Sequence, residues 1–417
     1  MEYILYVLVL IFALMGVPIF AIMSLFSAIA FHHADTELSA IAIEIYKIAS
    51  APTLLTIPLF TFAGYLMAES KSPQRLLKLA HAALGWLPGG VAIVSLVICA
   101  FFTAFTGASG VTIIALGGVL YPMLIKEKYD EDFTLGLITT SGSLGLLFPP
   151  SLPIILYGIV AKVDIDKLFL AGILPGILLI LVLSGYSVFK GKEIKIEKFS
   201  WPELKAGILA ARYEIPLPFI VLGGIYSGSI TPTEASAITA FYVLVMVCFL
   251  YKDINLFKDV PNIVKESMSL VGAILLILCC ALGITNYLVD EEIPLKILDI
   301  IREHVSSKII FLLFLNVFLL AVGAMMDIFS AIIVVVPLIL PIANEFGIDP
   351  IHLAIIFLTN LEIGYITPPV GINLFISSFR FDKSVLHLYK VAIPYFFLLL
   401  IALIIITYIP WLSLVWF

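Results

Sequence analysis

Two stretches of this sequence place small polar residues and a proline pair inside otherwise apolar runs. They read TTSGSLGLLFPPSLP at 139–153 and LTNLEIGYITPPVGI at 358–372. Adjacent prolines remove two backbone donors and displace the preceding residue from the helical region, so a helix breaks in each stretch. Lipid does not tolerate unpaired backbone groups, so such a break lines a polar cavity or is buried in protein. Matching interrupted segments in two halves of a chain indicate a transport site. The plain alternative is a pair of proline-kinked helices without a ligand.

Oxygen-bearing residues around the two breaks fall into two sets that suit Na⁺, which we expect as the only metal. Sodium site 1 is predicted at Thr106, Gly107, Ser109, Ser141, Gly142, Ser143 and Gly145. Sodium site 2 is predicted at Gly323, Asp327, Thr359, Asn360, Glu362, Gly364 and Thr367. Asp327 and Glu362 are the most informative members, because a carboxylate in an apolar segment is costly and by default functional. A single Ser or Thr in either set has an alternative role, a hydrogen bond to its own helix.

The composition places nearly the whole chain in a membrane. Hydrophobic residues make up 62% of the 417 residues and charged residues 12%, far from the usage of a soluble domain. The longest polar interval, 190–212, is too short to form a core of its own. The cysteines and histidines show no metal-ligand spacing, and we expect no cofactor.

An enzymatic function is not expected. An intramembrane hydrolase with Asp327 and Glu362 as a carboxyl pair is the alternative from that class, since paired acids are catalytic groups. However, no nucleophile motif accompanies the acids, and an internal repeat would have no role in a hydrolase. The absence of a P-loop motif disfavours direct ATP drive.

The two breaks belong to an internal repeat at an offset of 219 positions, which links roughly residues 50–185 to 269–404. Gly145 and Gly364 share this offset, as do the two proline pairs. When the apolar runs are taken as alternating spans, 17 of the 23 basic residues fall on one side. This excess strongly favours that side as the cytoplasmic one. The two repeats then have opposite topology, as in many secondary transporters.

These patterns predict an all-α polytopic membrane protein with two re-entrant helical hairpins and two broken transmembrane helices. Two full spans in place of each hairpin are the alternative, and residues 1–31 fit one tilted span or two short ones. The expected order is an N-terminal scaffold segment (1–50), repeat 1 (51–189, with hairpin 1 at 87–125 and a broken helix at 133–160), a cytoplasmic linker (190–213), scaffold helices (214–265), and repeat 2 (266–417, with hairpin 2 at 309–343 and a broken helix at 351–379).

Four motifs resemble those of one known family. They are FFTAFTGASGVTIIALGGVLYPMLIKEKY from residue 101, GLITTSGSLGLLFPPSLPIILYG from 136, GGIYSGSITPTEA from 223 and EIGYITPPVGINLF from 362. The chain is similar over essentially its whole length to the large, DctM-type membrane subunit of tripartite ATP-independent periplasmic (TRAP) transporters.

The resemblance implies an inverted-repeat, elevator-type importer of an organic acid, such as a C4-dicarboxylate, coupled to a sodium gradient. The protein would lie in a bacterial or archaeal inner membrane. Its partners would be a small four-helix membrane subunit and a periplasmic binding protein. A stand-alone sodium/carboxylate symporter is the alternative.

The resemblance also implies where the ligands bind. Each sodium would lie between a hairpin tip and a break, with the substrate between the two sites, near Ala108, Ser109, Pro149, Pro150, Pro368 and Pro369. Many family members have a Ser-Gly-Ser type of first tip, whereas this chain reads Thr106-Gly107-Ala108-Ser109. The substrate-contacting hydroxyl is therefore left unassigned.

Overall fold

The computed structural model describes residues 11–12, 15–33, 43, 45–46, 49–192, 198–305 and 307–417. These residues form helices and connecting turns, with no β-strand among them. Seven described helices are long and apolar enough to cross a membrane, or eight spans if one bent helix pair is counted as a single span. The predicted all-α membrane class is therefore confirmed. The choice between one span and two within 1–31 falls partly outside the described residues.

The first half of the chain contains one helical hairpin followed by one broken helix. Its elements are α2 (Ile19–His33), η1 (Pro52–Leu55), α4 (Thr56–Glu69), α5 (Ser72–Leu84), α6 (Gly90–Thr106), α7 (Ser109–Lys126), α8 (Glu131–Ser141), η2 (Leu144–Leu147), α9 (Leu152–Ala161), α10 (Ile165–Lys190) and α11 (Trp201–Ala210).

The second half repeats this order after a connecting helical arm. Its elements are α12 (Pro216–Pro218), η3 (Phe219–Gly223), α13 (Gly224–Tyr226), α14 (Pro232–Val245), η4 (Met246–Leu250), α15 (Val260–Asp290), α16 (Ile293–His304), α17 (Lys308–Met325), α18 (Ile328–Glu345), α19 (Pro350–Gly364), α20 (Ile372–Phe381), α21 (Val385–Tyr408) and α22 (Trp411–Leu414).

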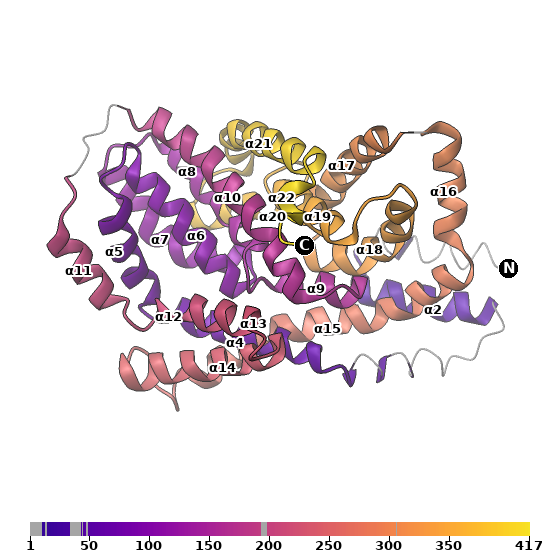
Figure 1. Ribbon diagram of the computed structural model, residues 1–417, viewed down its shortest axis with the longest axis horizontal. Coiled ribbons are helices and arrows are strands. Elements are labelled where there is room, and N and C mark those ends of the chain that lie inside the picture. Colours follow the sequence, from indigo (N-terminus) through magenta and orange to yellow (C-terminus); the bar gives the residue numbers. More distant parts are fainter. Residues whose placement is uncertain are drawn as a thin grey trace.

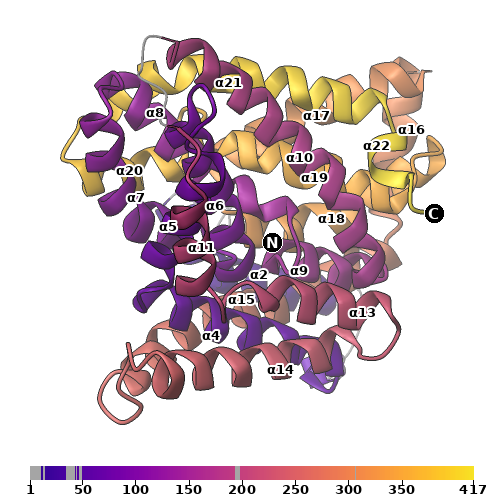
Figure 2. The same ribbon diagram turned by 60° about the vertical axis from the view of Figure 1, so that its left-hand side comes forward.

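The helices form two parts, which both views separate (Figures 1 and 2). Helices α2, α4, α14 and α15 lie together along one edge of the molecule, and we call them the four-helix layer. The two hairpins, α6–α7 and α17–α18, pack with the broken helices, α10 and α21 on the other side, and we call this part the hairpin body. Hairpin helix α6 packs on α4, and α18 packs on α15, so each hairpin contacts the layer.

Both helices break where the proline pairs predict. The first runs from α8 through the short turn η2 into α9, with a bend of 43°. The second ends at Gly364 and resumes as α20 at Ile372. The peptide bonds Pro149–Pro150 and Pro368–Pro369 are both cis.

The repeat also appears in how each break packs against its own hairpin. A Cβ on Gly145 would lie 2.4 Å from the backbone nitrogen of Ala104 in α6, and one on Gly364 would lie 2.4 Å from the backbone of Gly323 in α17. Ala104 and Gly323 are themselves 219 positions apart. Glycine therefore occupies both positions because the backbones leave no room for a side chain.

Candidate functional site

The first hairpin turns in two residues directly beside the first break. Gly107 ends α6 in the left-handed conformation, with φ of 65°, and Ala108 is extended before α7 begins at Ser109. A Cβ on Gly107 would meet the side chain of Leu152 at 2.4 Å. The tip is therefore held closely against the start of α9, and a residue larger than glycine would not fit.

Neutral oxygens gather between this tip and the break. The hydroxyl of Thr103 donates to the carbonyl of Gly142 at 2.8 Å and lies 2.8 Å from the hydroxyl of Thr112. The hydroxyl of Thr106 lies 3.4 Å from that of Thr112 and 3.5 Å from the carbonyl of Ala108. All three threonine side chains are buried. Clustered hydroxyl and carbonyl oxygens are ligands that hard cations take.

Two members of this cluster, Thr103 and Thr112, were not among the predicted site residues. Each lies one helical turn from a residue that was, since Thr103 precedes Thr106 by three positions and Thr112 follows Ser109 by three. Residues three apart share a helix face, so this spacing was the available signal.

The two predicted serines of the first break face other partners. The hydroxyls of Ser141 and Ser143 donate to carbonyls three residues earlier, at 3.2 and 3.3 Å. Ser109 and Pro150 are buried, whereas Ala108 and Pro149 are partly accessible. The structure thus brings Thr106 and Gly142 together through Thr103 and Thr112, whereas the hydroxyls of Ser141 and Ser143 bond back to carbonyls of α8.

Asp327, at the tip of the second hairpin, caps helix α18. One carboxylate oxygen accepts hydrogen bonds from the backbone N–H groups of Phe329 and Ser330, each at 3.0 Å. The other accepts from the hydroxyl of Ser330. This is an ordinary helix N-cap. The side chain is partly accessible, so its second oxygen keeps acceptor capacity for a cation.

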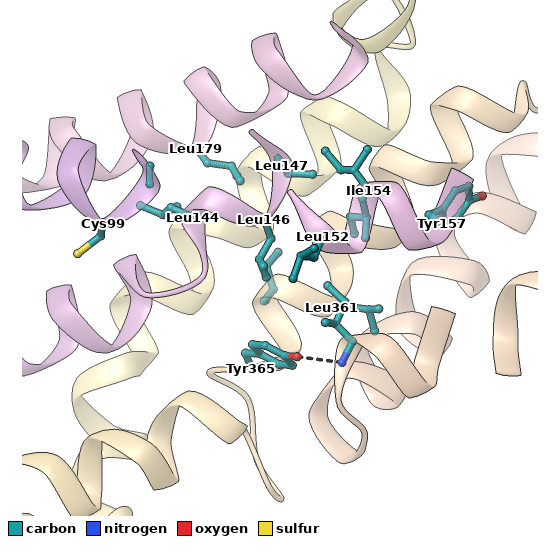
Figure 3. Packing of buried hydrophobic residues seen from close by; sticks show 14 of the residues in the cluster. Cys99, Leu144, Leu146, Leu147, Leu152, Ile154, Tyr157, Leu179, Leu361 and Tyr365 are labelled. Atoms are coloured by element: carbon teal, nitrogen blue, oxygen red, sulfur yellow. Dashed lines mark hydrogen bonds between the residues drawn. The ribbon is translucent and has the colours of Figure 1, made fainter. Parts of the chain in front are cut away.

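Backbone contacts fix the second tip to the second break. The N–H of Ile328 donates to the hydroxyl of Tyr365 at 2.8 Å, the contact drawn in Figure 3. The N–H groups of Val370 and Gly371 both donate to the carbonyl of Ala324 at 3.2 Å. Pro368, Pro369 and Val370 are exposed, whereas Pro150 and Ser151 of the first break are buried. The two breaks therefore differ in accessibility.

Three polar residues of the second set donate their side-chain hydrogen bonds away from the tip, and the side-chain oxygen of Asn360 has no partner. Thr359 and Thr367 donate to carbonyls four residues earlier, at 2.7 and 2.8 Å. Asn360 donates to the side-chain oxygen of Asn316 in α17 at 2.7 Å. These three residues therefore do not form an oxygen cluster like the one at the first tip.

Glu362 differs from these three residues because its side chain makes no hydrogen bond. Its side chain is fully buried, and neither carboxylate oxygen has a hydrogen-bond partner. An isolated buried carboxylate is strongly unfavourable as an ion, so it requires a counter-cation or a proton. No group of three His, Cys, Asp or Glu side chains suited to a metal is found in the described part of the chain.

A contact between the two repeats was also missed by sequence reasoning. Asn373 and Ser377 of α20 reach the first break, where they bond to Thr139 and Ser143. Asn373 lies within the EIGYITPPVGINLF motif, and its position four residues after the proline pair was the one available signal.

Comparison with known proteins identifies a family over almost the whole chain. Residues 4–412 match the family model described as "Tripartite ATP-independent periplasmic transporter, DctM component". The C4-dicarboxylate TRAP transporter large permease protein DctM of Vibrio cholerae is 35% identical, covering 98% of this chain and 96% of that protein. The protein of the same name from Pseudomonas aeruginosa is 37% identical, covering 90% of this chain and 88% of that protein.

Two further similarities bear on ligand and fold. The isethionate TRAP transporter permease protein DctMQ of Oleidesulfovibrio alaskensis is 36% identical, covering 86% of this chain and 57% of that protein. Among solved structures, the YdaH transporter of Alcanivorax borkumensis is similar with a TM-score of 0.61 at 14% identity, covering 88% of this chain and 87% of that one. That likeness concerns the fold alone.

Proposed function

This chain belongs to the DctM component family of tripartite ATP-independent periplasmic transporters, and from that premise we propose that it imports an organic acid by coupling uptake to a sodium gradient. The observation that carries the sodium coupling is the cluster formed by Thr103, Thr106, Thr112 and the Gly142 carbonyl. Neutral oxygens at a helix break are typical ligands for a coupling ion. The carboxylates of Asp327 and Glu362 supply negative charge in the second repeat.

The proposed substrate is a small organic anion, with a C4-dicarboxylate as the first choice. Two of the relatives are named for C4-dicarboxylates and one for isethionate, so an acidic group is the common feature of those named substrates. Helices α9 and α20 both begin at a break, and a helix N-terminus favours a nearby negative charge. We place the substrate between the breaks, beside Ala108, Ser109 and the two proline pairs.

The proposed mechanism is an elevator, in which the hairpin body moves against a fixed four-helix layer. Two cavities along the boundary between these parts support it. One of about 670 Å³ lies beside Lys162, Asp164, Thr285 and Ile333, and the other, of about 610 Å³, lies beside Glu69, Val111 and Glu266. Where these cavities interrupt the boundary, it opposes sliding less than a close-packed core does.

The proposed assembly has three parts, of which this chain and a second subunit lie in a bacterial or archaeal inner membrane. A small membrane subunit would pack beside this chain, and a periplasmic binding protein would deliver the substrate. These partners are inferred from the family and not from a surface of this chain.

Transport by reconstituted protein tests the proposal. Labelled succinate uptake is measured in proteoliposomes containing this chain alone, and then with its small membrane partner and binding protein, with an inward NaCl gradient or equimolar choline chloride. We expect uptake only with all components and sodium. Uptake by the chain alone would assign it to the stand-alone symporters. Equal uptake in choline chloride would exclude sodium coupling.

A further inference from the structure

The first break is held from two sides by residues of different repeats. On one side the hydroxyl of Thr103, in the first hairpin, donates to the carbonyl of Gly142 at 2.8 Å. On the other side the side-chain amide of Asn373, in α20, donates to the carbonyl of Thr139 at 3.1 Å and to the hydroxyl of Ser143 at 3.3 Å. Asn373 is fully buried. Nothing in the predicted sodium or substrate sites included it.

Both carbonyls need a partner because the helix is interrupted there. In a continuous helix the carbonyls of Thr139 and Gly142 would accept from the N–H groups four residues later. Instead the N–H of Ser143 donates to Thr140 at 3.4 Å, and that of Leu146 donates to Ser143 at 2.9 Å. Side chains from elsewhere take the place of the missing helical bonds, as buried backbone groups require.

The hydrogen bonds also decide which way the Asn373 amide faces. A backbone carbonyl only accepts, so the atom that faces Thr139 is the amide nitrogen. The side-chain oxygen of Asn373 is buried and has no hydrogen-bond partner. Beside it, Ser377 accepts a hydrogen bond from the hydroxyl of Thr139 at 2.8 Å. Ser377 thus bonds only the Thr139 side chain, whereas Asn373 bonds the Thr139 backbone.

We infer that Asn373 is a positioning residue through which the second repeat holds the first break in its ion-binding form. This inference rests on the proposed sodium coupling. Without the amide donor, the N–H of Ser143 is free to return to the carbonyl of Thr139 and extend α8 by one residue. The loop from Gly142 to Gly145 then rotates, and the Gly142 carbonyl leaves the hydroxyl cluster of the first hairpin.

Sodium titration of three variants tests this role. Asn373→Ala removes the amide, and Asn373→Leu keeps roughly its size but has no hydrogen-bond donor. Ser377→Ala is the matched control, because it leaves the Thr139 carbonyl bonded. Two sodium concentrations are measured for each variant. The first gives half-maximal uptake by the reconstituted complex. The second gives half of the maximal rise in the thermal midpoint of the purified chain, with choline chloride as the reference salt.

Both Asn373 variants are expected to raise each half-maximal sodium concentration at least tenfold, with a change below twofold for Ser377→Ala. A retained sodium response in Asn373→Leu would overturn the inference, because the size of the side chain would then matter and not the donor. The inference would also be overturned if both Asn373 variants lower the thermal midpoint equally in the two salts and leave the half-maximal sodium concentrations unchanged. A wild-type protein without any sodium response would overturn the proposed function and this inference with it.

Discussion

At the scale of single residues, the two membrane acids are in different situations. Asp327 is partly accessible and caps α18, whereas Glu362 is fully buried and its oxygens have no partner. From the sequence alone, both acids were predicted to bind a cation. In the structure Asp327 also caps a helix, so the predicted cation role must be tested separately from the cap.

Asp327→Asn separates the cap from the charge. Asparagine is about as good an N-cap as aspartate, whereas alanine costs about 0.5–2 kcal/mol. We expect Asp327→Asn to keep the thermal midpoint in choline chloride but to weaken sodium activation of uptake, and Asp327→Ala to lose both. Normal sodium activation in Asp327→Asn would limit this residue to capping.

Glu362→Gln tests the buried carboxylate. Glutamine keeps the size of the side chain and removes the ionisable group, so the unpaired buried charge no longer opposes folding. We therefore expect an unchanged or higher thermal midpoint in choline chloride and a smaller rise on adding NaCl. If sodium raises the midpoint of the variant as much as that of wild type, Glu362 does not contribute to ion binding.

At the scale of elements, the hairpins and broken helices are joined by close backbone contact at two glycines. Gly145 and Gly364 allow each break to lie directly against its hairpin, and both meet backbone atoms, which do not move aside as a flexible side chain would. The repeat found in the sequence thus corresponds to a repeated packing contact between elements.

Gly364→Ala is expected to separate α19 from α17. The added Cβ would lie 2.4 Å from the carbonyl carbon of Gly323, and overpacking of this kind costs about 1–3 kcal/mol. The thermal midpoint of the purified chain should therefore fall, and uptake with it. Gly185→Ala, in α10, is the control, because its Cβ would meet no atom within 4 Å. Equal midpoints for the two variants would show that the contact is looser than described.

At the scale of the whole molecule, a buried ionic cluster fixes α5 to the connecting arm. The guanidinium of Arg75 donates to Glu214 at 2.6 Å and to Asp253 at 2.7 Å. Its carbon lies 3.6 Å from the centre of the Tyr251 ring. Tyr251 in turn donates to Glu214 at 2.8 Å. These residues come from distant parts of the sequence and hold the two ends of the α12–η4 arm against α5.

Arg75→Ala leaves Glu214 buried without its cation. Removing one partner of a buried pair costs about 3–5 kcal/mol, and the Glu214 side chain is 0% exposed. We expect a large loss of thermal stability, while the double variant Arg75→Met with Glu214→Leu recovers part of it. Lys167→Ala is the control, because its pair with Asp164 is solvent-exposed and exposed pairs contribute little. A loss no larger than the control's would show that the cluster is dispensable.

The sequence by itself determined the membrane class, the two breaks and the repeat. The membrane class and the breaks depend on properties local to a few residues: apolar runs of sufficient length and proline pairs that remove donors. The repeat is a likeness of the sequence to itself at an offset of 219 positions. These effects act whatever the rest of the chain does, so they are readable without a structure. The predicted positions of Thr106 and Gly142 in one cluster followed from the same reasoning.

Only the tertiary structure decided which oxygens face one another. Thr139 and Ser377 are 238 positions apart, and Ser143 and Asn373 are 230 apart, so no local pattern pairs them. Thr103 and Thr112 join the first cluster, Asn360 turns to Asn316, and Asp327 caps a helix. Hydrogen-bond partners depend on helix rotation and packing, and a small rotation changes which side chain reaches a freed carbonyl. Local chemistry therefore placed the breaks, and the packing of the two repeats against each other decided what holds them.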